Sequence, residues 1–163
     1  MKAGMISLGC SKNQVDSEMI LGLLENNNFE ITSSVDECDL IIINTCGFIN
    51  ASKRFKELND YNYKDSVKFD NFLRNYSTCP ILIIDDFGNE VKNDVVRDGV
   101  LLQILNARAS KRLFTIFTSD FSIDEIVDLY STSKAATPRA NQIGKIIKGF
   151  AKEEINLGDI SLY

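Results

Sequence analysis

The chain has 163 residues, of which 44% are hydrophobic and 25% are charged, and its formal net charge at pH 7 is −5. This composition is typical of a globular protein with one domain or two very small ones, and its net negative charge gives no general attraction to nucleic acid. The sequence contains no His, which excludes imidazole bases and Ser-His or Cys-His nucleophile pairs. No apolar run has the length of a membrane span, and the first ten residues are too short and too weakly apolar for a signal peptide. We therefore expect a cytoplasmic protein whose four cysteines are reduced or bind metal.

The amino-terminal part predicts strands that alternate with one helix. In chain order we expect a strand at 3–8, a helix at about 13–27, and strands at 29–32 and 40–44. The helix carries apolar residues at helical spacing, which predict one buried stripe: Val15, Met19, Ile20, Leu23 and Leu24. A crossover helix implies parallel strands. Cys10 and Cys46 then both lie just past the carboxyl ends of strands, at the same edge of the sheet.

Two segments of this part carry a family resemblance. They are Ile6–Glu18, with Leu-Gly-Cys-Ser-Lys-Asn-Gln at its centre, and Ile43–Ile49, with Asn-Thr-Cys-Gly-Phe. Both closely resemble the amino-terminal domain of radical-SAM methylthiotransferases, in the branch that modifies an aspartate of a small-subunit ribosomal protein. The resemblance implies that Cys10 and Cys46 are two ligands of an auxiliary 4Fe–4S cluster, since thiolates on neighbouring loops can share one cluster. It covers residues 1–53, and the CxxxCxxC triplet of the family's catalytic cluster is absent from these 163 residues.

The remaining cysteines leave alternatives open. The family's third cluster ligand lies in a Gly-Cys-Leu context some thirty residues beyond Cys46, and Cys79 stands near that distance in the different context Thr-Cys-Pro. Cys38 is expected to be a half-buried thiol before a strand. The segment Gly4–Ser11 has the glycine spacing of a P-loop, but Cys10 stands at the lysine position, so we expect no nucleotide at this loop.

The run Cys79–Gly88 is the central feature of the second part. Its apolar residues, Ile81–Ile84, are typical of a strand that is buried on both faces of a parallel sheet. Asp85 and Asp86 follow at the carboxyl end, where open α/β sheets bind ligands. Two interpretations are open: a Walker B site, in which Asp85 holds Mg²⁺ and Asp86 orients a water molecule, or a plain strand end followed by a turn.

The rest of the chain continues the alternation of helices and strands. We expect a helix at 65–76, the strand at 80–84, a helix at about 93–109, a second buried strand at 113–118, a helix capped by Ser122, a basic helix at 139–152, and a hairpin of strands at 154–157 and 159–163. The fold class that we predict is α/β, with three layers, a mostly parallel sheet, helices on both faces and a small carboxy-terminal hairpin. The strand order does not follow from the sequence.

A second resemblance covers residues 54–163. Ile81–Glu90, Val96–Leu101 and Phe117–Ser122 resemble the Walker B to sensor 1 region of AAA+ ATPases, and specifically the bacterial replicative helicase loader, the primosomal protein related to IstB-type ATPases. The resemblance implies that Asp85 binds magnesium, that Asp86 polarises the hydrolytic water, and that Asp120 takes the sensor 1 position, where the family usually has Asn.

The last predicted helix offers cations for the same implied nucleotide site. Arg139, Lys145 and Lys148 stand near the places of the loader arginines that contact nucleotide. Because Lys is a point charge, it does not reproduce the bidentate fork of Arg. The alternative interpretation is a solvated basic face on an amphipathic helix.

Each resemblance omits one part of a working site. No Walker A motif occurs in these 163 residues, and the P-loop normally supplies most of the phosphate binding. We interpret the chain as a methylthiotransferase-like segment, 1–53, joined near residues 52–54 to a loader-like segment, 54–163. A sheet that lacks a strand leaves backbone donors unpaired, so we also expect oligomerisation or partial disorder.

Three functions stay open. The first is a fragment or degenerate form of the loader, inactive as an ATPase, for which the resemblance implies Mg/ATP as cofactor and the replicative helicase, other loader subunits or single-stranded DNA as partners. The second is the iron–sulfur-binding amino-terminal part of a methylthiotransferase. The third is a chimeric chain without a selected function.

Overall fold

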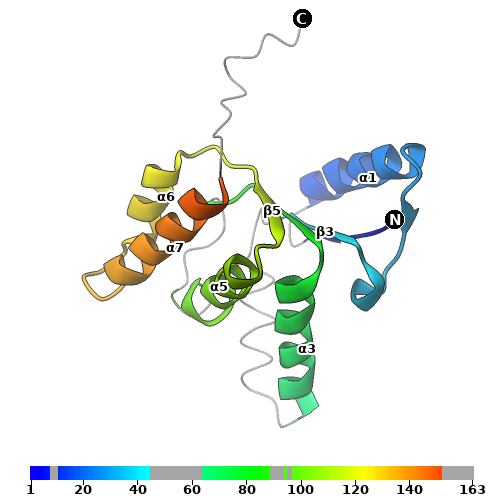
Figure 1. The fold of residues 1–163 in the computed structure, drawn as a ribbon. Helices are drawn as coiled ribbons and strands as arrows, with labels where there is room; N and C mark the ends of the chain where they lie inside the picture. Colours follow the sequence, from blue (N-terminus) through cyan, green and yellow to red (C-terminus); the bar gives the residue numbers. More distant parts are fainter. Residues whose placement is uncertain (8–10, 45–63, 89–93, 95–96, 152–163) are drawn as a thin grey trace, which may run out of the picture.

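The computed structural model describes residues 1–7, 11–44, 64–88, 94 and 97–151. Figure 1 shows the arrangement of the elements. In chain order these are β1 (Lys2–Ser7), α1 (Ser11–Asn26), β2 (Glu30–Ile31), the 3-10 turn η1 (Val35–Glu37), β3 (Leu40–Asn44), α3 (Lys64–Thr78), β4 (Ile81–Asp85), the π-helical turn η2 (Arg97–Leu101), α5 (Leu102–Lys111), β5 (Phe114–Phe117), α6 (Ile123–Tyr130) and α7 (Thr137–Phe150). None of the helices in these ranges is long and apolar enough to cross a membrane.

The five described strands form one parallel sheet in the order β2-β1-β3-β4-β5. The register aligns Met5, Ile42, Ile83 and Ile116 across β1, β3, β4 and β5. This arrangement confirms the predicted α/β fold with a parallel sheet. Of the described strands, β5 and β2 lie at the two edges.

The sheet has two faces that are covered to different extents. On the first, which we call the main face, the side chains of Ile41, Leu82 and Ile84 pack with α3, α5, α6 and α7 in the larger core. On the second, the α1 face, Leu40 and Ile42 pack beneath Ile20 and Leu24 of α1. Helices therefore lie on both faces, and Figure 1 shows α1 apart from α3 and α5.

Helix α1 covers only part of its face of the sheet, and two predictions about burial are therefore wrong. The strand at 113–118 was expected to be buried, but Phe114 is 63% exposed and Ile116 is 38% exposed, and Ile81 and Ile83 of β4 are half-buried. The reason is that α1 packs over β1 and β2, at the opposite side of the sheet from β5. The predicted stripe on α1 is also too wide, because Met19 and Leu23 are exposed while Ile20 and Leu24 face the sheet.

Helix boundaries differ from the prediction where local chemistry decides them. The described part of the helix predicted at 93–109 begins with the π-helical turn η2 and ends at Lys111. Arg112 caps this end with a left-handed φ of 55°. The helix predicted at 139–152 begins at Thr137, since Pro138 suits a first helical turn, and ends at Phe150. The predicted hairpin at 154–163 lies outside the described residues.

Candidate functional site

Polar residues gather where the strands end, at the carboxyl edge of the sheet. The register places Ser7, Asn44 and Asp85 side by side at the ends of β1, β3 and β4. Thr118 follows β5 directly and completes the row. The sequence carries the signal for this row, because a polar residue follows each of these largely apolar segments. Only tertiary structure places the four in one line.

Asp85 is anchored by Thr118. The Thr118 hydroxyl donates to Asp85 Oδ1 at 2.5 Å and accepts from the backbone N–H of Asp86 at 2.9 Å. The backbone adds two more bonds, since Thr118 N–H donates to the Ile84 carbonyl at 3.0 Å and Phe87 N–H donates to the Thr118 carbonyl at 2.8 Å. One threonine therefore joins the turn after β4 to the end of β5.

The turn after β4 adopts backbone conformations that favour short or small residues. Asp86 lies in the left-handed region, with φ of 61°, where Asp is tolerated better than most residues. Gly88 has φ of 101°, and a Cβ at that position would lie 3.0 Å from Phe121 Cδ2. The tight approach of Phe121 and the positive φ both require glycine here.

A second hydroxyl, that of Ser119, closes the same pair of loops. Ser119 Oγ donates to the Phe87 carbonyl at 2.5 Å and accepts from the Phe121 N–H at 3.0 Å. The sequence prediction named Asp85, Asp86 and Asp120 for this edge and missed the roles of Thr118 and Ser119. Both hydroxyls bond across the two loops, so neither contact is local in sequence.

Asp120 and the cations of α7 were also predicted to contribute to this site. Asp120 is exposed, two residues beyond Thr118. Lys148 donates to Asp124 of α6 at 2.6 Å in a surface ion pair, and Lys145 and Arg139 are exposed on α7. The roles assigned to these four residues stay predictions.

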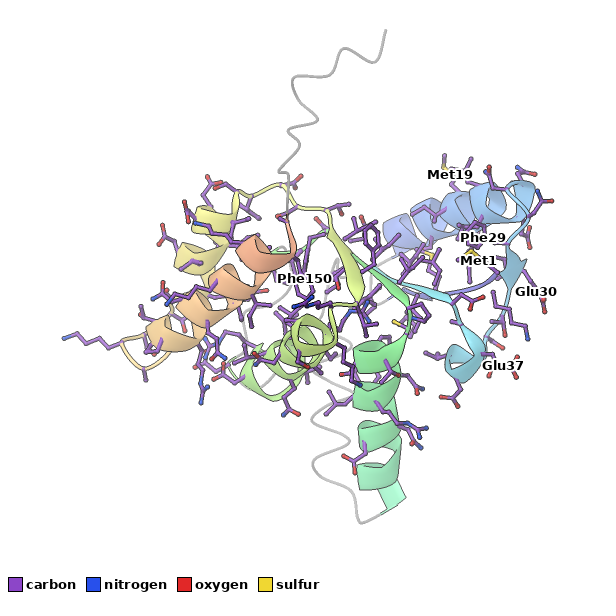
Figure 2. All side chains as sticks on the ribbon, in the orientation of Figure 1. Met1, Met19, Phe29, Glu30, Glu37 and Phe150 are labelled. Carbon is purple, nitrogen blue, oxygen red and sulfur yellow. The ribbon has the colours of Figure 1, made fainter. Side chains whose placement is uncertain are left out.

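The three cations of α7 lie at different distances from the carboxyl edge of the sheet. The ring of Phe150, labelled in Figure 2 at the end of α7, lies with its centroid 6.3 Å from that of Phe117 at the end of β5. The carboxyl end of α7, with Lys148, therefore lies near the end of β5. Arg139 lies about 16 Å from Phe150, toward the amino end of α7, at ~1.5 Å per residue.

The two cysteines implied as cluster ligands, Cys10 and Cys46, lie outside the described residues. Cys79 is buried and precedes β4, at its amino end. Strand β4 is about 16 Å long, at ~3.3 Å per residue, so Cys79 and the carboxyl ends of the described strands β1 and β3 lie at opposite ends of the sheet. Burial raises the pKa of the Cys79 thiol, although the Arg108 guanidinium opposes the shift.

Cys38 was expected to be half-buried, and this is wrong. Its side chain is only 7% exposed, and Sγ donates to the Ser34 carbonyl at 3.4 Å. A Cβ on Gly4 would lie 2.6 Å from Cys38 Sγ, so the thiol fills the space beside this glycine. Burial raises the pKa of the Cys38 thiol, and the neighbouring Cys79 adds to the shift.

The carboxyl edge offers few side chains that could bind a metal ion. Within the described ranges, no group of three or more Cys, Asp or Glu side chains is arranged to hold a metal ion. Asp85 would supply a carboxylate oxygen to the magnesium ion that the loader resemblance implies, and one of its two oxygens already accepts the Thr118 hydroxyl. A shallow depression lies beside this edge, lined by Phe121, Glu125, Asp128, Leu129 and Thr132.

Comparison with known proteins identifies relatives for the amino-terminal part. Residues 2–69 match the family described as "Uncharacterized protein family UPF0004". The chain is 39% identical over 108 residues to the ribosomal protein uS12 methylthiotransferase RimO of Clostridium botulinum, a match that covers 63% of this chain and 22% of that protein. RimO of Natranaerobius thermophilus is 57% identical over 53 residues, which are 32% of this chain and 12% of that protein.

RimO of Clostridium perfringens matches over a longer stretch, with 34% identity over 152 residues. This match covers 82% of the chain, more than the first 53 residues, and 32% of that protein. The chain thus spans less than a third of the length of the RimO relatives named here. The junction near residues 52–54 stays a prediction.

A solved structure, that of DnaI, has a similar fold. It superposes with a TM-score of 0.50 at 20% sequence identity and covers 93% of this chain and 67% of that one. At this identity the likeness concerns the fold alone. The sequence matches and the structural match correspond to the two resemblances found in the sequence.

Proposed function

We propose that this chain is a degenerate form of the primosomal helicase loader, which contacts a replicative helicase or other loader subunits and does not hydrolyse ATP by itself. The observation that carries the proposal is the double contact of the Thr118 hydroxyl with Asp85 and with the Asp86 N–H. In the Walker B interpretation the Asp85 carboxylate binds magnesium. Here Asp85 Oδ1 accepts a short hydrogen bond that joins two loops, which supports a structural role for this carboxylate.

Two further observations support the same function. The fold is similar to that of DnaI over most of the chain, and these 163 residues contain no Walker A motif. Because P-loop N–H groups and the P-loop lysine supply most of the binding energy for phosphates, the carboxylates of β4 alone should not retain ATP.

Calorimetric titration with MgATP tests the nucleotide part of the proposal. We expect no heat of binding at micromolar nucleotide for the full chain. The matched variants are Asp85→Ala and Asp70→Ala, since Asp70 is an exposed carboxylate on α3. A micromolar affinity that Asp85→Ala abolishes and Asp70→Ala retains would show that the edge is a working nucleotide site.

The partner is tested separately by sedimentation velocity of the chain mixed with the replicative helicase of the same organism. Co-sedimentation is expected if the loader function is retained. Two independent boundaries over the micromolar range would contradict the proposed partner, whatever the nucleotide result.

A second function, iron–sulfur binding, is favoured by the strand register. Ser7 and Asn44 are paired at the ends of the adjacent strands β1 and β3, and Cys10 and Cys46 follow these two residues closely in the sequence. The match of residues 2–69 to UPF0004 covers both cysteines. Anaerobic reconstitution should then give a brown protein that contains iron, and Cys10→Ser with Cys46→Ser should remove the colour while Cys38→Ser retains it. A colourless, iron-free product would eliminate this function.

A further inference from the structure

Strand β5 presents an apolar edge to solvent. It pairs with β4 on one side and is the outermost described strand on the other. Its side chains Phe114 and Ile116 point to the α1 face and are 63% and 38% exposed. An apolar edge strand is a template for pairing with another strand, and natural proteins usually protect such an edge with charges, proline or a covering segment. Phe114–Phe117 contains neither a charge nor a proline.

The backbone of β5 defines which groups face outward. Thr118 bonds to β4 through both its N–H and its C=O. Since the backbone groups of successive strand residues point to alternate sides, those of Phe117 and Thr115 point away from β4. These two residues therefore direct donors and acceptors toward the side of β5 on which no other described strand lies.

We propose that β5 pairs with β5 of a second copy of this chain, in antiparallel orientation about a two-fold axis at Thr115. In this register Thr115 faces Thr115 of the second copy in a hydrogen-bonded pair. Phe114 of each copy then lies opposite Ile116 of the other, in the non-hydrogen-bonded pairs where side chains approach most closely. The two half-covered α1 faces become continuous across the dimer.

The charges at the two ends of β5 favour this orientation. Lys111 and Arg112 precede the strand, and Asp120 follows it; all three are exposed. An antiparallel partner brings the basic end of one strand beside the acidic end of the other, twice by symmetry. A parallel partner would place like charges together, which is unfavourable. Because the interface is small, the dimer should be weak and the charges should make it sensitive to salt.

Sedimentation equilibrium of the full chain, from one to several hundred micromolar, tests the proposal. We expect the average mass to rise toward twice the monomer mass of 18.3 kDa. Ile116→Lys should weaken the dimer at least about tenfold, because it places a charge in both apolar cross-strand pairs. Met19→Lys is the matched control, since Met19 is 64% exposed and lies on α1, where Figure 2 labels it. This variant should dimerise like the unmodified chain.

A charge exchange tests the orientation independently of folding. Arg112→Glu and Asp120→Lys should each weaken the dimer severalfold, and the double variant should regain affinity. Amide hydrogen exchange supplies the second readout, since the N–H groups of Thr115 and Phe117 should become protected as concentration rises. A monomer at all concentrations, a dimer that Ile116→Lys leaves intact, or concentration-independent protection of these amides would each overturn the proposal. The last result would mean that the chain covers its own edge. The test does not depend on the loader function.

Discussion

Arg108 is a buried charged residue that serves the fold. It is fully buried, and its guanidinium donates to the carbonyls of Tyr76, Cys79 and Phe114 and to Thr115 Oγ1, at 2.6 to 2.9 Å. These acceptors belong to the end of α3, the start of β4 and the start of β5. Burial lowers the pKa of Arg108 from its ordinary value, but five N–H donors with good acceptors keep a guanidinium satisfied.

We predict that Arg108→Met destabilises the protein by about 3 kcal/mol or more, because several buried carbonyls lose their donor at once. Urea denaturation followed by circular dichroism measures the change. Arg74→Met is the control, since Arg74 is exposed on α3 and should shift stability by less than about 0.5 kcal/mol. Equal effects of the two substitutions would refute a structural role for Arg108.

A second prediction at this scale concerns Thr118. Thr118→Val keeps the β-branched shape but removes the hydrogen bonds to Asp85 and Asp86. We expect a loss of about 1 kcal/mol, at the low end for a charge-assisted bond because the site is exposed. Thr118→Ser should retain most of the stability in thermal unfolding. If Val and Ser behave alike, the hydroxyl does not hold the two loops together.

At the scale of elements, the packing of α7 on α6 depends on one glycine. A Cβ at Gly144 would lie 2.4 Å from Val127 Cγ2, well inside contact distance. The helices therefore approach closely because this position has no side chain. Helix α6 begins with a capping box, in which Ser122 and Glu125 exchange hydrogen bonds.

Gly144→Ala should destabilise the protein by about 1 to 3 kcal/mol through overpacking, even though Ala is the better helix former. Gly149 provides the control on the same helix, since nothing lies within 4 Å of a Cβ there. Gly149→Ala should be neutral or stabilising by up to about 1 kcal/mol. Guanidinium denaturation should therefore show a loss of stability for Gly144→Ala and no loss for Gly149→Ala, and a stabilising Gly144→Ala would contradict the close approach to Val127.

At the scale of the whole molecule, the larger core contains three side chains that can lose a proton, namely two thiols and one phenol. Burial raises the pKa of Cys38, Cys79 and Tyr76 above their ordinary values. The folded state thus favours the neutral forms of all three. Their contribution to stability is fully present below the unfolded-state pKa values and is lost as the pH rises through the folded-state values.

We expect the free energy of unfolding to stay constant from neutral pH to about pH 8.5 and to decrease above that pH. The decrease should reach up to about 1.4 kcal/mol per pH unit for each group. Its cause is that the thiols, and at higher pH the tyrosine, ionise in the unfolded state before they do so in the folded state. Urea titrations at a series of pH values measure this slope. Cys38→Ala should reduce it. Unchanged stability between about pH 8.5 and 10.5 would show that these groups do not remain neutral in the fold.

For the described residues, the sequence by itself determined the main strands and helices. Continuous apolar runs marked β3, β4 and β5, and helical spacing marked α1 and α3, because these are local signals with fixed periods. Asp85 and Asp86, at the end of β4, were also placed correctly at the carboxyl edge, since parallel strands all end on the same side. The family resemblances were visible in the residues around Cys10, Cys46 and Asp85.

Only the tertiary structure decided the strand order, the partial cover of the α1 face and the anchoring of Asp85 by Thr118. Each of these depends on which residues distant in sequence become neighbours. The apolar run of β5 is the clearest case: its composition indicates a buried strand, yet its place at the edge, away from α1, leaves Phe114 and Ile116 exposed. Hydrophobicity records a preference for burial, whereas the positions of the other elements determine whether that burial occurs within one chain.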